Sequence, residues 1–204
     1  MVPIRIAGTG SLTWGKTGAL SPAHLAYMDT PARYAAGLRR IHWLTVLLLV
    51  AAYVVIEQRN LFPRGSGPRA LMVQGHFWTG LSIFMFAAWR VVLRLRRGAP
   101  PITPAPPRWQ ALFAKAMHLS LYLFLLVMPL LGLATAWSDG KQLLLPFTDI
   151  ALPALLPADK PLAHQLEDIH GTIGEVFYWV IGLHIVAALY HHFWVRDDTL
   201  RRMR

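Results

Sequence analysis

The chain has 204 residues, of which 55% are hydrophobic and 15% charged, and its mean hydropathy is +0.41. This composition is too apolar for a soluble domain of that length and predicts an integral membrane protein. Because the sequence has no cysteine, disulfides, iron–sulfur clusters, thiolate haem ligands and covalent CxxCH haem attachment are excluded. The net charge of +10 is typical of basic cytoplasmic loops facing anionic lipid, and we do not expect nucleic-acid binding.

Residues 1–27 contain scattered Gly, Thr and Pro, with neither an apolar run nor a small-residue cleavage pattern. They fit neither a signal peptide nor a spanning helix, and we expect residues 1–30 to be a disordered N-terminal extension. The segment MDTPARYAAGLRRIHWL, which begins at Met28, reads like a natural start. We therefore expect the extension to have no function, and we discount His24 as a ligand.

Four apolar runs follow, at about residues 39–58, 72–96, 109–137 and 164–195. Each is long enough for a membrane-spanning helix, so residues 31–204 are predicted to form an all-α bundle of four transmembrane helices. The proline-rich segment APPITPAPPR is a stiff spacer between the halves, and a kink is expected at Pro129. Residues 138–163 form a long loop whose apolar pieces are expected to lie on the membrane surface and cover a cofactor.

The fourth run carries His170 and His184, fourteen positions apart. At ~100° per residue this is nearly four turns, so the imidazoles share one face and lie ~21 Å apart along the helix. That rise places them near opposite sides of a ~30 Å hydrocarbon core, where unoccupied polar nitrogens are costly. A single such histidine would more often pack against a nearby carbonyl. Two at this spacing, with histidines in the other runs, favour two stacked haems.

The basic residues predict the orientation. With four spans, both termini share a side with the 96–110 linker, and that side has fifteen of the 20 Lys and Arg residues. The other side has five: Arg59, Arg64, Arg69, Lys141 and Lys160. The positive-inside rule therefore predicts that both termini are cytoplasmic.

This orientation sorts the histidines by depth. His76 and His170 each begin a helix that descends from the outer face, whereas His42 begins a helix that rises from the inside and reaches the level of His184. We expect two irons, each bound by two of these histidines, as in electron-carrying b-type haem proteins. His191, ~20° from His184 around the helix, is a shallower alternative. We favour His184, because His191 would leave one haem at the very edge of the bilayer.

Two features are less specific. Gly80 follows His76 by one turn, and Gly174 follows His170 by one turn. A missing side chain there lets a flat macrocycle approach the backbone, although small residues are common at any membrane helix interface. His118, near the start of the third run, fits a haem ligand, a quinone contact or a packing residue.

Several segments, in order along the chain, also carry a family resemblance: RRIHWL, EQRNLFPR, the His76 helix, HLSLYLFLLVMPLLGL, HQLEDIHGTIGEVFYWVIGLHIVAALYHHFW and DDTLRRM. Over about residues 30–204 the chain resembles the bacterial cytochrome b561 family, with its superoxide oxidase (superoxide:ubiquinone oxidoreductase) branch the nearest likeness. The resemblance implies two haems b, superoxide as periplasmic donor, ubiquinone as acceptor, and an inner-membrane location. It places the family's haem ligands on His42, His76, His170 and His184.

Candidate substrate contacts follow from charge. Superoxide is an anion, so the residues expected to hold it near the outer haem are Arg59, Arg64, Arg69, Lys141 and Lys160. Each alone is more often a solvated loop charge, and the outer loops carry six acids against these five bases, so any steering is local. For the quinone, His118 lies at the cytoplasmic end near Arg90 and Arg94. An imidazole there can hydrogen-bond a carbonyl and help to deliver protons.

Three classes of function are compatible with these features. The first is an enzyme that oxidises superoxide and reduces quinone. The second is a haem-binding electron conduit, like the cytochrome b subunit of a dehydrogenase, supplied by a periplasmic or membrane protein. The third is a divalent-metal carrier, which is the weakest because Glu175, ~140° around the helix from His170, is the only acid well inside a span.

Overall fold

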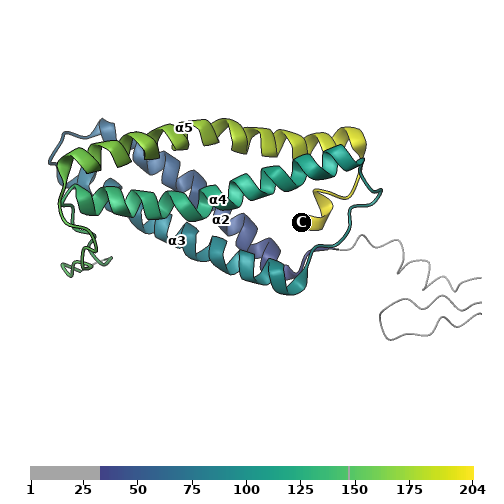
Figure 1. Cartoon of the computed structure of the whole chain (residues 1–204), viewed down its shortest axis with the longest axis horizontal. Helices are drawn as coiled ribbons and strands as arrows, with labels where there is room; N and C mark the ends of the chain where they lie inside the picture. The colour runs from purple at the N-terminus through teal and green to yellow at the C-terminus, as the bar shows by residue number, and fades with distance from the viewer. Residues whose placement is uncertain (1–32, 147) are drawn as a thin grey trace, which may run out of the picture. The chain divides into compact units, whose positions relative to one another are not determined.

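The computed structural model describes residues 33–146 and 148–204, and all structural statements refer to these residues. The expectations for residues 1–30 and for His24 lie outside this part of the chain. Residues Arg33–Arg204 form one unit, built from four long helices (Figure 1): α2 (Ala36–Gln58), α3 (Gly67–Arg97), α4 (Arg108–Ser138) and α5 (Lys160–Tyr190). The 3₁₀ helix η1 (Arg59–Leu61) continues α2, the π-helix η2 (His191–Val195) continues α5, and the 3₁₀ helix η3 (Arg201–Met203) lies near the C-terminus.

Helices α3 and α5 begin several residues before the apolar runs that predicted them, and residues that favour helix starts lie at these positions. Asp159 precedes α5, and its side chain accepts a hydrogen bond from the Leu162 amide at 3.0 Å. Pro161 occupies the first turn of α5, and Pro68 that of α3, where a missing amide proton has no cost. The hydropathy pattern does not detect these polar first turns. Pro129 lies inside α4, which remains one helix from end to end.

All four helices, with their short extensions, are long and apolar enough to cross a membrane. Within the described residues there is no β-strand, and Leu144 and Ala151 form one isolated bridge. Large apolar side chains point away from the bundle, as for Leu47, 66% exposed, and Trp179, 83% exposed. A surface this apolar suits lipid rather than water. The predicted all-α bundle of membrane-spanning helices is therefore confirmed.

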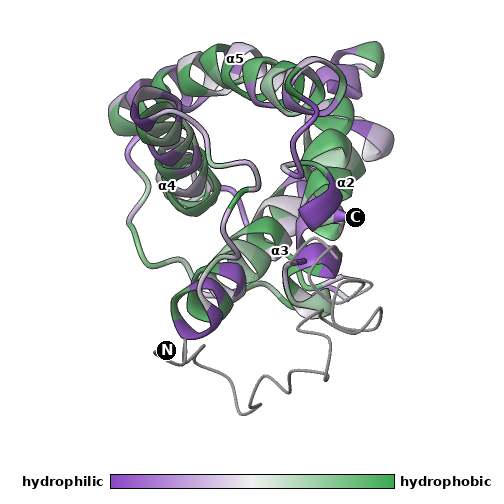
Figure 2. Cartoon of the chain, turned by 90° about the vertical axis from the view of Figure 1, so that its right-hand side faces the viewer, coloured by the Kyte–Doolittle hydropathy of each residue, from purple (hydrophilic) through white to green (hydrophobic). Residues whose placement is uncertain are grey.

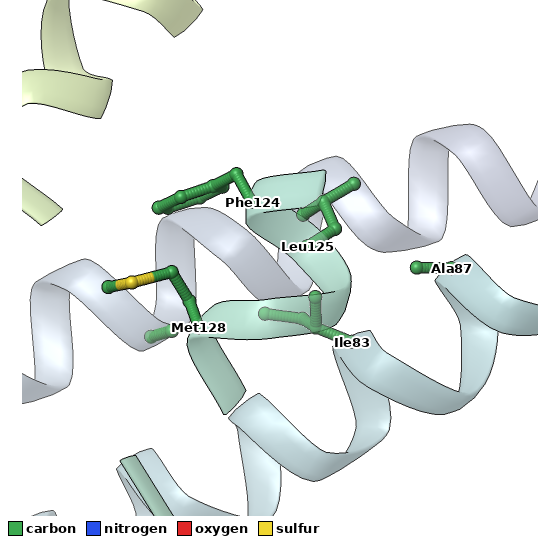
Figure 3. Close-up of a cluster of buried hydrophobic side chains, with 6 residues drawn as sticks. Ile83, Ala87, Phe124, Leu125 and Met128 are labelled. Atoms are coloured by element: carbon green, nitrogen blue, oxygen red, sulfur yellow. The ribbon is translucent and has the colours of Figure 1, made fainter. Parts of the chain in front are cut away.

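The helices surround a common axis in the order α2, α3, α4, α5, which Figure 2 shows end-on. Helix α3 packs against α2 and α4, and α4 packs against α5. A small cluster of buried apolar side chains lies where α2, α3 and α4 meet (Figure 3): Ala52, Ile83, Ala87, Phe124, Leu125 and Met128. Phe124 stacks on Phe177 of α5, with ring centroids 4.0 Å apart. This cluster therefore lies midway between the His170 and His184 levels of α5.

Residues 139–146 and 148–159 lie across one end of the bundle, which we call the loop end. Trp78 donates its indole N–H to the Leu144 carbonyl at 2.8 Å. Gln74 donates to the Gln142 carbonyl at 2.8 Å, and Leu143 between them is buried. The loop thus covers the first turns of α3, and its expected role in covering a cofactor stays a prediction.

Residues 196–204 fold back under the opposite end, which we call the tail end (Figure 1). Asp198 accepts a hydrogen bond from the Thr103 amide at 3.0 Å, and Arg202 donates to the Pro100 carbonyl. Trp43 donates to the Met203 carbonyl at 2.9 Å. This charged segment, which contains the buried side chains of Asp197, Asp198 and Arg202, ties the 98–107 linker to α2.

Candidate functional site

Two histidines face each other at the loop end, one from α3 and one from α5. The ring centroids of His76 and His170 are 6.1 Å apart, and their planes are nearly perpendicular, at 79°. Nδ1 of His76 lies 3.0 Å from the Ala52 carbonyl, which accepts its proton and leaves Nε2 as a lone-pair donor. Nδ1 of His170 is buried and has no hydrogen-bond partner among the described residues. These are the two residues that the depth argument assigned to the outer level.

A cavity of about 330 Å³ lies beside this pair and is lined by side chains from all four helices. Both imidazoles line it, together with apolar residues and several glycines: Leu49, Ala52, Ile56, Val73, Phe77, Ile83, Phe124, Leu125, Met128, Gly132, Gly171 and Gly174. The cavity is therefore a mainly apolar space beside two imidazoles whose nitrogens can bind a metal.

The His170 ring lies against Gly132 of α4. A Cβ atom added at Gly132 would lie 3.0 Å from Cε1 of His170, closer than the ring tolerates without moving. The glycines singled out from the sequence have more room: an added Cβ would meet Pro129 at 3.9 Å from Gly80 and Met128 at 3.9 Å from Gly174. The sequence reasoning missed Gly132. The signal was present, because Gly132 follows His118 by the same fourteen residues that separate the two histidines of α5.

Three histidines converge at the tail-end level, where two were expected to pair. The His118 and His184 rings lie edge to face, with centroids 5.6 Å apart, and Nδ1 of His118 lies 2.6 Å from the Ala114 carbonyl. Nδ1 of His42 lies 2.9 Å from Nη1 of Arg90. His42 is also within electrostatic range of both other rings. The structure thus brings His42, His118 and His184 together, with His118 against His184.

The histidine pairs fit a haem iron held between two imidazoles. A metal–imidazole nitrogen bond is about 2 Å long, so two rings on opposite sides of one metal have centroids roughly 6 Å apart. The 6.1 Å between His76 and His170 agrees with this value, and so does the 5.6 Å between His118 and His184, which leaves His118 and His42 both as candidate partners of His184. The hydrogen bond from His76 to a backbone carbonyl is the support that ligating histidines usually have. The unpartnered Nδ1 of His170 and the apolar cavity fit the same group.

His191, the alternative inner ligand, has another partner. Its Nδ1 lies 2.5 Å from Oδ2 of Asp197, which is buried and also accepts from the Thr199 amide. Burial raises the pKa of Asp197, but the hydrogen bonds from His191 and Thr199 lower it by more, so the pKa lies below its ordinary value. His191 is therefore hydrogen-bonded to the 196–204 segment, whereas His184 faces the imidazole of His118.

The five basic residues proposed to hold an anion differ in their surroundings. Lys141 and Lys160 both bind Asp139, at 2.8 and 2.6 Å, and their hydrogen bonds lower the pKa of that carboxyl group. Arg69 donates to the Arg59 carbonyl at 3.0 Å. Arg59 and Lys141 line the cavity, and the other three basic residues, Arg64, Arg69 and Lys160, do not.

Three carboxylates also line the cavity: Glu57, Glu167 and Glu175. Tyr178 donates its hydroxyl proton to Glu57 at 3.1 Å. Glu175, expected to lie away from the His170 face, reaches the cavity because the space extends around α5. The lining therefore has more acidic than basic side chains.

A family model and several known proteins are similar to this chain. The family model of prokaryotic cytochrome b561 matches residues 33–204. Cytochrome b561 homolog 1 of Escherichia coli (strain K12) is 33% identical over 80% of this chain and 92% of its own length. The probable superoxide oxidase CybB of Yersinia pestis is 34% identical over 80% of this chain and 90% of its own length. Cytochrome b561 homolog 2 of Escherichia coli (strain K12) is 28% identical over 88% of this chain and 95% of its own length.

The family match covers the whole of the described bundle, including both histidine levels. It implies b-type haem binding and electron transfer at a membrane, in agreement with the facing imidazoles. The chain belongs to the prokaryotic cytochrome b561 family.

Proposed function

We propose that this cytochrome b561 holds two haems, oxidises superoxide at its loop end and reduces ubiquinone at its tail end. The observation that carries the proposal is the presence of two histidine levels in one bundle. His76 faces His170 with ring centroids 6.1 Å apart at one level, and His184 lies with His42 and His118 at the other. The similarity to a probable superoxide oxidase favours the same branch of the family. Bound between these imidazoles, b-type haem would carry single electrons across the membrane. Each superoxide leaves as dioxygen after giving up one electron, and the quinone takes up two electrons and two protons.

At the loop end we assign the iron ligands to His76 and His170. The bond from His76 to the Ala52 carbonyl fixes its ring and keeps Nε2 unprotonated for the metal. Gly132 lets the His170 ring lie against α4. Gly80 and Gly174, one turn from the ligands, add no side chain of their own beside the site.

At the tail end we assign the ligands to His42 and His184, the positions that the family resemblance implies. His118 is then a third imidazole beside the site and our candidate for the quinone contact. Its other neighbours include Arg90 and Arg94, both close enough to act on it electrostatically. His118→Phe should leave both haems in place but slow their reoxidation by a soluble ubiquinone analogue. Loss of a haem in this variant, with both retained in His42→Ala, would assign the ligand role to His118 instead.

For the donor, the positive-inside rule places the loop end in the periplasm. There Arg59 and Lys141 are the basic side chains on the cavity that also contains His76 and His170. Positive potential at this point raises the association rate of an anion and is screened by salt. Haem reduction by pulsed superoxide should therefore be fast and should slow as ionic strength rises.

The acidic lining favours one alternative, an electron conduit for a protein donor. Glu57, Glu167 and Glu175 outnumber the two basic residues on the cavity, and a negative rim attracts a cationic partner rather than superoxide. Slow reduction by superoxide that is indifferent to salt would favour the conduit. A visible spectrum of the purified protein that lacks haem bands would contradict both functions and leave a metal carrier.

A further inference from the structure

Arg90 occupies on α3 the place that a tail-end histidine occupies on the neighbouring helices. It follows His76 by fourteen residues, as His184 follows His170. Fourteen residues are nearly four turns, so Arg90 lies on the His76 face of α3, about 21 Å along the helix. The guanidinium therefore lies at the level of His118 and His184, and its hydrogen bond to His42 agrees with this position.

Among the described residues, no carboxylate forms an ion pair with the guanidinium of Arg90. It is partly buried within a membrane-spanning helix, lies 5.5 Å from the centroid of the Tyr122 ring, and donates to Nδ1 of His42. None of the ion pairs formed by the described residues includes it. A charged side chain inside a span is costly unless a partner satisfies it. An imidazole satisfies one of its five N–H donors and none of its charge.

Ligation by His42 would end this hydrogen bond. A guanidinium only donates, so Nδ1 of His42 accepts and the ring proton is on Nε2. If His42 bound a metal through Nε2, its ring proton would lie on Nδ1, which could then no longer accept from Arg90. If it bound through Nδ1, Arg90 would lose that acceptor directly. In both cases the guanidinium would lose its hydrogen-bond acceptor, and an anion at the same level would replace it and neutralise the charge.

We propose that Arg90 binds a propionate carboxylate of the tail-end haem. When the haem is bound, this contact replaces the hydrogen bond between Arg90 and His42. This inference rests on the proposed function, in which His42 and His184 hold that haem. A haem brings two carboxylates into the bundle, and a carboxylate matches the planar fork of arginine. The same guanidinium suits the phosphate of an anionic lipid headgroup, which is the other source of an anion at this depth.

The test is the rate at which haem is lost to excess apomyoglobin from the purified holoprotein in phosphatidylcholine nanodiscs. Because charge-assisted hydrogen bonds are the strong class, Arg90→Gln should accelerate the loss of one haem by about tenfold. Arg90→Lys should lie in between, since it keeps the charge without the fork. Arg97→Gln, an exposed arginine on the same helix, is the matched control and should leave both rates unchanged.

Two further arms identify the anion. Protein depleted of one haem is titrated with haem or with haem dimethyl ester, which has no carboxylates. The wild type should bind the ester about tenfold more weakly, whereas Arg90→Gln should bind both equally. Equal loss rates in wild type and Arg90→Gln would overturn the proposal, as would an effect seen only when phosphatidylglycerol is present. If the wild type contained no haem at all, the proposed function itself would fail.

Discussion

The two histidine levels use the same helices but differ in what surrounds the rings. At the loop end, α4 contributes Gly132, and the space beside His170 belongs to a cavity of about 330 Å³. At the tail end, α4 contributes His118 and α3 contributes Arg90, and residues 196–204 close the bundle beneath them. The fourteen-residue repeat of α5 thus places one histidine at each level, and the neighbouring helices leave a cavity beside one level and make the other polar and closed.

The largest effect should come from filling the open level. Gly132→Val places a branched side chain where even a Cβ would lie 3.0 Å from His170. Because overpacking a fitted site typically costs about 1–3 kcal/mol, the loop-end haem should be retained roughly tenfold less well. Haem content by pyridine haemochrome measures this. Gly182→Val, on α5 with nothing within 4 Å of an added Cβ, is the control. Retention of both haems in Gly132→Val would show that the loop-end site does not depend on the missing side chain at Gly132.

The next effect concerns the closed level. Asp197→Asn removes a buried carboxylate bonded to His191 and Thr199, which should destabilise the tail-end level by about 1–3 kcal/mol. Because the pKa of Asp197 is lowered in the folded protein, its stabilisation is present above about pH 4, its unfolded value, and is lost as the pH falls through the folded value.

Thermal melting followed at the haem absorption band checks this prediction. The melting temperature of Asp197→Asn should be lower than that of wild type at pH 7, and the two should converge below about pH 4. Asp168→Asn, which changes an exposed acid at the loop end, should melt like wild type. A constant difference between Asp197→Asn and wild type from pH 7 to pH 3 would exclude the carboxylate charge as the cause.

A smaller effect should separate the basic residues at the loop end. Arg59→Gln removes a cation that lines the cavity, and superoxide should reduce it roughly threefold more slowly at low salt. The difference should disappear at high salt, where the charge is screened. Arg64→Gln removes a cation that does not line the cavity and should match wild type. Equal slowing in both variants would mean that net charge, rather than the cavity lining, steers the donor.

The sequence predicted the four helices from hydropathy, and it paired His76 with His170 by depth, because the positive-inside rule sets the direction in which each helix crosses the membrane. It could not decide whether His42 or His118 lies against His184, because the face that α2 or α4 turns toward α5 depends on packing between helices. Glycine contacts had the same limit: Gly80 and Gly174 were found by their spacing from a histidine on their own helix, and Gly132 touches a histidine of another. The partners of Lys141 and Lys160 depend on how residues 139–159 fold, which no pattern in that loop indicated.

The most direct test of the account is the number of haems bound per chain, measured by pyridine haemochrome on purified wild type and on His-to-Ala variants at each level. The wild type should bind two. His76→Ala and His170→Ala should each lose the same loop-end haem and keep the other, and His42→Ala and His184→Ala should do the reverse. A wild type with one haem, or a variant at one level that loses both haems while the bundle stays folded, would contradict the existence of two separate sites.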